Sequence, residues 1–387
     1  MSMKSGCSKN VFIVCRMQQN WRKKFIFVAA SGGKVTDCKF FRCLEMEFLN
    51  DKKRIDKVMD RRHFIKAGIG AAIVSQLPFA AAAQGTATGP TRKVGKLEKL
   101  SLRSVRIPVG IEKPFSALHV SDSHLTFADT RDDERKWKLA AGRQRIFLRA
   151  EHYLNEAITF ANRHEMPILH TGDLIDFVSE ANLDMVAAHF QQADWFVAAG
   201  NHEYSQYVGE ALEDAAYRAA SFDKVQAAYP NDLNCASRVI NGLNLVSLDN
   251  GYYQVTEQQH QFVMEQVKKG LPIVLMVHVP FYAPQQCELG LKQTKGLCAY
   301  LAGVPLEITS KYDPNFKGTE QWRNRGVQQR ATKATLDFVA WLKEQPLLKG
   351  ILAGHCHYYF QEQFSPTCVQ YTVAAGYTGQ AQVVQFC

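Results

Sequence analysis

Five short apolar segments of the chain each end in a cluster of histidine, aspartate or asparagine. The clusters are Asp122-Ser123-His124, Gly172-Asp173-Leu174-Ile175-Asp176, Gly200-Asn201-His202-Glu203, His278-Val279-Pro280 and Gly354-His355-Cys356-His357. In open α/β sheets, ligands bind beyond the carboxyl ends of the strands. Five strands that all place metal-ligating side chains there predict one shared crevice.

The rest of the chain after residue 100 alternates between apolar runs and amphipathic stretches, which predicts an α/β protein. Strands are expected at 115–121, 168–171, 195–199, 237–240, 243–248, 272–277, 350–353, 371–374 and 382–386. Helices are expected at 146–163, 180–192, 256–268 and 327–344, the third starting with a capping box at Thr256 and Gln259. Residues 127–145 and 281–325 show little periodicity and are expected to be long loops or insertions.

The five clusters carry weight because they occur together and in order. A pair such as Asp122 and His124 is expected roughly once by chance in a chain of this length, whereas a fixed tetrapeptide is far rarer. If the backbone is extended, Asp122 and His124 lie on the same side of it, and so do His355 and His357. Cys356 then points away from the metals, as a buried thiol.

The order of the motifs from Asp122 to His357 is similar to that of the calcineurin-like metallophosphoesterase superfamily. The resemblance implies an α/β fold, a two-sheet β-sandwich flanked by helices in four αββα layers, with two divalent metal ions at the strand ends. The ligands it implies are Asp122, His124 and His357 for the first ion, Asn201, His278 and His355 for the second, and Asp173 as the bridge. His202 would face the substrate without binding a metal.

These residue types suit the hydrolysis of a phosphate ester. Two cations roughly 3.5–4 Å apart neutralise the ester and lower the pKa of a bridging water. A histidine beside a ligand, here His202, can donate a proton to the leaving alkoxide. Asp176 and Glu203 could orient His202 or a ligand imidazole. Imidazole and carboxylate ligands accept Mn, Fe, Zn or similar ions, so the ligand types leave the metal open.

At some motif positions this chain has other residues than known branches of the superfamily, and these differences indicate which branch it resembles. Protein Ser/Thr phosphatases carry an arginine where Phe177 follows Asp176. Purple acid phosphatases have a tyrosine in place of Asp176 and a glycine in place of His124. The aspartate-x-histidine form resembles the branch with bacterial cyclic-nucleotide phosphodiesterases, nucleases and sphingomyelinase-like enzymes.

The function predicted from these residues is metal-dependent hydrolysis of phosphodiesters or phosphomonoesters by a metal-bridging water. One alternative is a non-catalytic metal-containing binding protein on the same fold. Another is a lipid-phosphodiester hydrolase, which an exposed apolar patch in residues 281–325 would favour. Basic side chains in residues 127–145 could reach a phosphate, or could form a solvated surface; they are Arg131, Arg135, Lys136, Lys138, Arg143 and Arg145.

The positive charge of the chain is confined to its N-terminal fifth. Residues 1–58 hold 13 lysines and arginines against five acidic residues, whereas residues 84–387 hold 30 against 31. The main part of the chain therefore has no bulk electrostatic basis for binding nucleic acid or an anionic membrane.

Residues 59–83 are typical of an export signal. Arg61 and Arg62 precede a short apolar run and an Ala-x-Ala site near Ala83, which resembles a twin-arginine signal. The run is too short for a membrane anchor. This predicts transport by the twin-arginine machinery to the periplasm or beyond, followed by a linker at 84–100 and a catalytic domain at 101–387.

The signal is preceded by 58 residues, although export signals lie at the start of a chain. The interpretation is that translation starts at Met59 and that residues 1–58 are a basic upstream segment from a misplaced start. The alternative is a genuine extra segment with short strands at 11–15 and 24–30. Six cysteines follow residue 83, and Cys287 with Cys298 is the preferred disulfide pair, with free buried thiols as the alternative.

Overall fold

The computed structural model describes residues 11–19, 22–30, 99–208, 215–312 and 327–387. The chain forms two units, residues 1–89 and 90–387. In the first unit, β1 (Val11–Gln19) and β2 (Arg22–Ala30) pair as an antiparallel hairpin. The proposed signal at 59–83 and nearly all of the linker at 84–100 lie outside the described residues.

The second unit contains two mixed sheets. The strand order of the first sheet is β3 (Ser101–Ile107), β13 (Gln380–Phe386), β4 (Phe115–Val120), β5 (Ile168–Thr171) and β6 (Trp195–Ala198). The order of the second is β11 (Phe360–Ser365), β12 (Cys368–Thr372), β10 (Leu348–Ala353), β9 (Ile273–Met276), β8 (Leu243–Leu248) and β7 (Cys235–Ile240). Strands β4, β5 and β6 run parallel, as do β8, β9, β10 and β12, so each sheet gathers several carboxyl ends at one edge.

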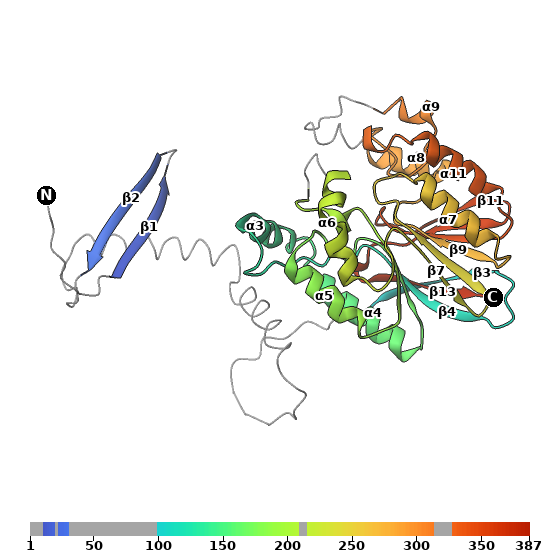
Figure 1. Ribbon diagram of the computed structural model, residues 1–387, viewed down its shortest axis with the longest axis horizontal. Helices are drawn as coiled ribbons and strands as arrows, with labels where there is room; N and C mark the ends of the chain where they lie inside the picture. The colour runs from blue at the N-terminus through green and yellow to red at the C-terminus, as the bar shows by residue number, and fades with distance from the viewer. Residues whose placement is uncertain (1–10, 20–21, 31–98, 209–214, 313–326) are drawn as a thin grey trace, which may run out of the picture. The chain divides into compact units, whose positions relative to one another are not determined.

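Helices cover the outer faces of both sheets, which confirms the predicted four-layer α/β sandwich. Figure 1 shows α4 (Ala150–Arg163) and α5 (Glu180–Phe190) on one side of the strands and α7 (Glu257–Val267) and α11 (Lys333–Lys343) on the other. Alternation along each strand builds the layers. On β5, Ile168 packs with α4 in one apolar cluster, whereas Leu169 packs against Val274 and Leu352 of the other sheet.

Most predicted strands lie within one or two residues of their expected bounds, but β12 begins three residues earlier than the strand expected at 371–374. The capping box of Thr256 and Gln259 begins α7 as predicted. Helices occur where loops were expected: α3 (Glu134–Arg143), α8 (Pro284–Gln293) and α9 (Leu306–Thr309). Ala140 is the buried residue of α3, so the helix lacks the apolar stripe from which it could have been predicted in the sequence. Three further elements were not predicted from the sequence: α6 (Ala215–Ala228), β3 and β11.

Two predicted helices start later than expected. The helix expected from residue 146 begins at Ala150, and the preceding Ile146 and Leu148 are 57% and 81% exposed. The helix expected from residue 327 begins at Lys333, because the Thr332 side chain accepts a hydrogen bond from the backbone amide of Thr335 and caps it.

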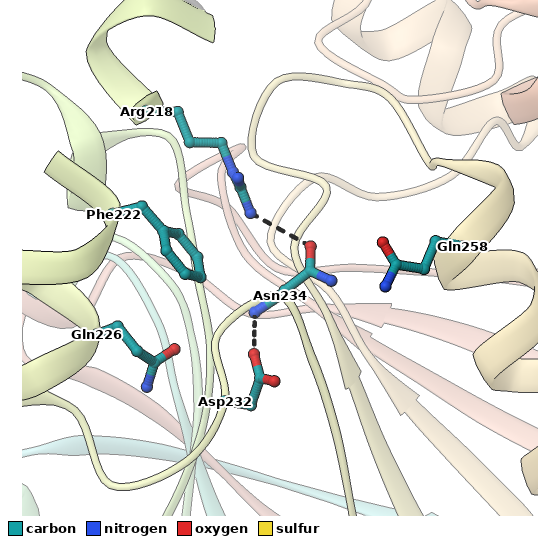
Figure 2. Close-up of a pocket in the computed structure, with 6 residues that line it drawn as sticks. All are labelled: Arg218, Phe222, Gln226, Asp232, Asn234 and Gln258. Carbon is teal, nitrogen blue, oxygen red and sulfur yellow. Dashed lines mark hydrogen bonds between the residues drawn. The ribbon is translucent and has the colours of Figure 1, made fainter. Parts of the chain in front are cut away.

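A pocket of about 500 Å³ lies beside α6 and α7 (Figure 2) and is lined by Arg218, Phe222, Gln226, Asp232, Asn234 and Gln258. An Arg218 Nη2 hydrogen bond to Asn234 Oδ1, at 3.2 Å, crosses it. Its lining includes none of the residues predicted to bind metal. In the described part of the chain, no helix is both long enough and apolar enough to cross a bilayer.

Candidate metal centre

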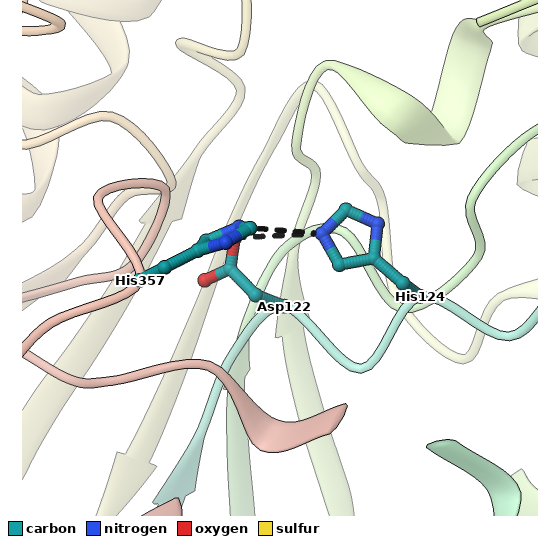
Figure 3. Close-up of side chains that lie close together, drawn as sticks. All are labelled: Asp122, His124 and His357. Carbon is teal, nitrogen blue, oxygen red and sulfur yellow. Dashed lines mark hydrogen bonds and ion pairs between the residues drawn. The ribbon is translucent and has the colours of Figure 1, made fainter. Parts of the chain in front are cut away.

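The predicted ligands converge at the carboxyl ends of the parallel strands. Asp122 and His124 follow β4, Asp173 follows β5, Asn201 and His202 follow β6, His278 follows β9, and His355 and His357 follow β10. Three groups have ligand atoms within 4.8 Å of one another: Asp122, His124 and His357; His124, Asp173 and His202; and Asp173, His278 and His355. Figure 3 shows the first group, in which the ring of His357 lies over Asp122 and faces His124. The side chains that the motifs were predicted to bring together therefore lie close to one another at this edge of the sheets.

Asp173 lies between two imidazole clusters. Its Oδ2 is 3.2 Å from His278 Nε2 and 3.7 Å from His124 Nε2. Its Oδ1 accepts a hydrogen bond from the backbone amide of His202 at 2.9 Å. Because Asp173 shares a group with each set of histidines, one carboxylate is available to both.

Hydrogen bonds made by one ring nitrogen of each histidine, on the side facing away from the centre, determine which nitrogen is available to a metal. His278 Nδ1 donates to the Thr171 carbonyl at 2.7 Å, and His124 Nδ1 donates to Asp176 Oδ1 at 3.2 Å. Since a carbonyl or carboxylate oxygen only accepts, Nε2 is the nitrogen left to bind a cation in both residues. His355 has the opposite orientation: Tyr253 Oη lies 2.9 Å from its Nε2, and its Nδ1 lies 3.2 Å from His278 Nε2.

The donor atoms fit a pair of divalent cations. Asn201 Oδ1 and Asp122 Oδ1 are buried and accept no hydrogen bond from the described residues, although His357 Nε2 lies 3.0 Å from the latter. A buried polar atom without a partner is unfavourable, and a bound cation would remove that penalty. Imidazole nitrogens with carboxylate and amide oxygens suit Zn, Mn or Fe.

The carboxylates Asp122 and Asp173 and the His278 imidazole stabilise one another's charged forms, whereas burial lowers the pKa values of His124 and His355. Burial alone would raise the pKa values of Asp122 and Asp173, but neighbouring histidines, led by His357 for Asp122 and His278 for Asp173, hold both well below their usual range. Burial would lower the pKa of His278, yet Asp173 and Asp122 raise it to about 9. These carboxylates therefore favour the protonated form of His278, and a cation bound at its Nε2 would have to replace that proton.

Two glycines leave room for these ligands. A Cβ on Gly354 would collide with Ser121 Oγ and lie 2.6 Å from Asp122 Oδ2, and one on Gly172 would lie 2.6 Å from the Gly200 amide nitrogen and 2.7 Å from His278 Nδ1. Gly172 also has a φ of +90°. Both glycines directly precede or flank a ligand, so any side chain there would displace the ligand itself.

Replacing Gly354 by alanine is expected to lower metal affinity at least about tenfold, because the new Cβ would collide with Ser121 Oγ and crowd the neighbouring Asp122 carboxylate. Metal per chain, measured by elemental analysis after dialysis against limiting Mn, checks this. Gly142→Ala on α3 is the matched control, because a Cβ there meets no atom within 4 Å. Equal metal content in the two variants would show that the close approach at Gly354 is unimportant.

The ligand pairs are brought together by a different backbone geometry from the one predicted. Asp122, His124, His355 and His357 have φ values of +53°, +49°, +65° and +58°, and Asp173 has +55°. These are left-handed turn conformations, so the expected alternation along an extended backbone is wrong. Each such residue stores on the order of 1–3 kcal/mol of strain, which is typical of functional sites.

Cys356 lies away from the imidazole clusters, as predicted, although for another reason. Its Sγ is 3.9 Å from the Tyr300 carbonyl oxygen and 3.8 Å from Gln286 Nε2. Burial raises the pKa of this thiol to about 12, so it stays protonated and is a poor metal ligand. Cys287 and Cys298 share an apolar cluster, but no disulfide joins them, so the preferred pair is wrong.

Asp176 contacts two imidazoles of the centre, as expected. Its Oδ1 lies 3.2 Å from both His124 Nδ1 and His202 Nδ1, and its carbonyl accepts from His202 Nδ1 at 2.7 Å. His202 Nε2 therefore faces the centre, 4.0 Å from Asp173 Oδ2.

Glu203 has other partners than expected. It accepts hydrogen bonds from the backbone amides of Asp173, Leu174 and Gly200 at 2.8, 2.7 and 2.7 Å, and from Tyr229 Oη at 3.1 Å. The 3-10 turn His202–Tyr204 directs Glu203 into the core, and its side chain contacts no imidazole through these bonds. Glu203 thus shapes the Asp173 turn rather than orienting a histidine.

Glu203→Gln is expected to destabilise the fold by about 1–3 kcal/mol. The substitution replaces one carboxylate oxygen, which accepts hydrogen bonds from buried backbone amides, by an NH₂ group that cannot accept them. Urea unfolding, compared with the exposed control Glu165→Gln, checks this prediction. An unchanged midpoint would show that Glu203 does not anchor the turn.

The sequence reading missed several residues that support the centre. Asn250 Oδ1 accepts from the amides of His278 and Val279 at 3.1 and 3.0 Å, and Tyr253 contacts His355. Asp249-Asn250-Gly251 follows β8 in the same way that the ligand clusters follow their strands, so the same rule could have found it. Phe147 stacks on the His124 ring, with centroids 4.6 Å apart, and no sequence pattern indicated this.

Two histidines outside the motifs, His119 and His170, are buried in the core. His119 Nε2 lies 2.9 Å from Thr171 Oγ1, and burial lowers the pKa of His119 to about 4. His170 Nε2 lies 3.0 Å from Ser123 Oγ, and burial lowers the pKa of His170 to about 3. Both imidazoles are neutral and pack beneath the centre without joining the ligand groups.

The model of the calcineurin-like phosphoesterase family matches residues 115–359, which span all five motifs. The two sheets and the histidine–aspartate centre at their strand ends agree with that match. The chain belongs to the calcineurin-like phosphoesterase family. Its members hydrolyse phosphate esters with bound metal ions, so the chain is classed as a metal-dependent phosphoesterase.

Solved structures with a related fold have low sequence identity to this chain. A dimetal phosphatase from Danio rerio is 12% identical with a TM-score of 0.39, covering 70% of this chain and 88% of that one. A 5'-nucleotidase from Candida albicans is 11% identical with a TM-score of 0.31, and the match covers 72% of this chain but about half, 48%, of the nucleotidase. Phosphopantetheinyl hydrolase from Mycobacterium tuberculosis is 11% identical with a TM-score of 0.31, covering 67% and 90%. No curated protein sequence matches the chain.

Proposed function

We propose that the chain hydrolyses phosphate esters at a centre of two divalent metal ions. The observation that carries the proposal is the position of Asp173, whose carboxylate lies between two sets of imidazole and carboxylate groups. Two bound cations would neutralise the ester and activate a water for attack on phosphorus.

The ligands are assigned to the two ions by their grouping. Asp122, His124 and His357 form one group, and His278 and His355 belong to another. Asn201 is assigned to the second ion from the family resemblance, and its buried Oδ1 accepts no hydrogen bond from the described residues. Asp173 groups with His278 and His355, and its Oδ2 also lies 3.7 Å from His124 Nε2 of the first group, so it is the proposed bridge. The hydrogen bonds that His278 donates to the Thr171 carbonyl and His124 donates to Asp176, together with the contact between Tyr253 and His355, hold three of these imidazoles in place before metal binds.

His202 is the proposed proton donor to the leaving group. Its Nδ1 donates to the Asp176 carbonyl, so its Nε2 is directed to the centre. The Asp176 carboxylate, 3.2 Å from Nδ1, favours the imidazolium form that a proton donor needs. His202 also completes one geometric metal-ligand group with His124 and Asp173, and the two roles are separable by mutation.

The experiment that tests the proposal compares a chromogenic phosphodiester with the matching monoester. The purified chain is assayed without chelator, with and without added Mn, and its metal content is measured. Metal-dependent turnover supports the proposal, and the faster ester identifies the bond class. Two bound metals without turnover on either ester would favour a binding protein. Preference for vesicle-borne lipid diesters would favour a lipid-phosphodiester hydrolase.

We also propose that the chain is exported to the periplasm or beyond through the twin-arginine machinery, with Met59 as the translation start. The motif around Arg61 and Arg62 supports this proposal. Mass spectrometry of the precursor tests the start site: a peptide from residues 5–50 would contradict it. Cell fractionation of an Arg61→Lys, Arg62→Lys double variant tests the route, and retention in the cytoplasm is the expected result.

A further inference from the structure

The segment between the first two ligand motifs contains an arginine, Arg143, that contacts Asp176. Asp176 in turn contacts the imidazoles of His124 and His202. Arg143 is the last residue of α3, within residues expected to be a loop. Its Nε donates to Asp176 Oδ2 and its Nη2 donates to Asp176 Oδ1, both at 2.6 Å. This is a two-pronged arginine–carboxylate pair, the geometry in which such pairs are strongest and most specific.

We propose that Arg143 is a positioning residue for hydrolysis that acts through Asp176 on His202. The inference rests on the proposed function, because it requires that His202 take part in turnover. Asp176 is fully buried and its Oδ1 lies 3.2 Å from Nδ1 of His202. The orientation of this one carboxylate therefore determines where the His202 ring is held.

Arg143 fixes the Asp176 carboxylate in a way that the histidines do not. Both imidazole contacts converge on Oδ1 alone, so without Arg143 the carboxylate could rotate about its terminal bond. The guanidinium contacts both oxygens and prevents that rotation. Arg143 also lies over Phe147, with its Cζ 5.0 Å from the ring centroid, and Phe147 stacks on His124.

Other charge pairs of the insertion differ from this one. Arg131 pairs with Asp129 and Asp184, but the three side chains are 49%, 38% and 66% exposed, compared with 24% for Arg143 and 0% for Asp176. Exposed pairs contribute little to stability. Arg131 therefore provides a control that alters the same insertion and removes the same charge without touching Asp176.

The experiment is a double-mutant cycle on Arg143 and His202, run at saturating Mn so that metal content is equal. Arg143→Met should lower kcat by about 10–100-fold with little change in KM, as is typical when a supporting partner of an active-site group is removed. The loss should be larger for an alkyl ester, whose leaving group needs a proton, than for a 4-nitrophenyl ester. In the His202→Ala background, Arg143→Met should produce almost no further loss.

Three results would overturn the inference: equal losses with the two leaving groups, full additivity in the double variant, or the same loss in Arg131→Met. If Arg143→Met does not fold, the cycle is run with Arg143→Lys, which keeps the charge but not the two-pronged contact. A His202→Ala variant with wild-type turnover would instead contradict the proposed role of His202. Additivity alongside a slow His202→Ala variant would contradict only the role of Arg143.

Discussion

Asp173→Asn is expected to abolish metal-dependent hydrolysis, with turnover falling by more than about 10²–10³-fold. The substitution keeps the shape of the side chain but removes the negative charge that both sets of ligands share. The pKa of Asp173 is held well below its usual range by His278 and His202, against the effect of burial, so the native carboxylate is ionised. An amide at that position cannot neutralise two cations.

The same variant should hold less metal. Elemental analysis and the paired diester and monoester assays, made on the same preparation, measure both effects. Asp184→Asn is the matched control, because the Asp184 side chain is 66% exposed and pairs with Arg131 at the surface. An Asp173→Asn variant that keeps two metals and full turnover would refute the bridging position.

The part of the fold that could be predicted from sequence is the part with local causes. Buried strands such as Ile168–Thr171 and Leu243–Leu248 are continuous apolar runs, and Thr256 caps its helix through a residue three positions away. The convergence of the ligands also follows from a local rule, because polar clusters after parallel strands meet at one edge. These features depend on neighbouring residues and on the general geometry of sheets.

The parts that sequence could not provide depend on contacts across the fold. Arg143 meets Asp176 across 33 positions, and the residues between them carry no pattern that pairs the two. The sequence does not indicate whether the Glu203 carboxylate contacts an imidazole or backbone amides. The conformation of the turn that contains Glu203 directs it to three backbone amides. The left-handed turns at Asp122 and His355 are stabilised by tertiary contacts, since non-glycine residues avoid that region.

His202→Ala is expected to separate catalysis from metal binding. If His202 donates the proton to the leaving alkoxide, its removal should slow turnover by roughly 10²–10⁴-fold while both metals stay bound. The structure favours this separation because His202 Nε2 is 4.0 Å from Asp173 Oδ2, whereas His278 Nε2 is 3.2 Å from it. The Asp176 carbonyl and carboxylate bind the far side of the His202 ring.

The measurement pairs turnover with metal per chain, using esters whose leaving groups differ in basicity. The loss should grow with the basicity of the leaving group, because a nitrophenolate departs without a proton and an alkoxide does not. His164→Ala is the control, an exposed histidine at the end of α4. Loss of a metal in His202→Ala would show that the group of His124, Asp173 and His202 is itself a metal site. The centre would then have to supply the proton from another residue, since Asp176 is buried and its carboxylate is held in ionised form by Arg143.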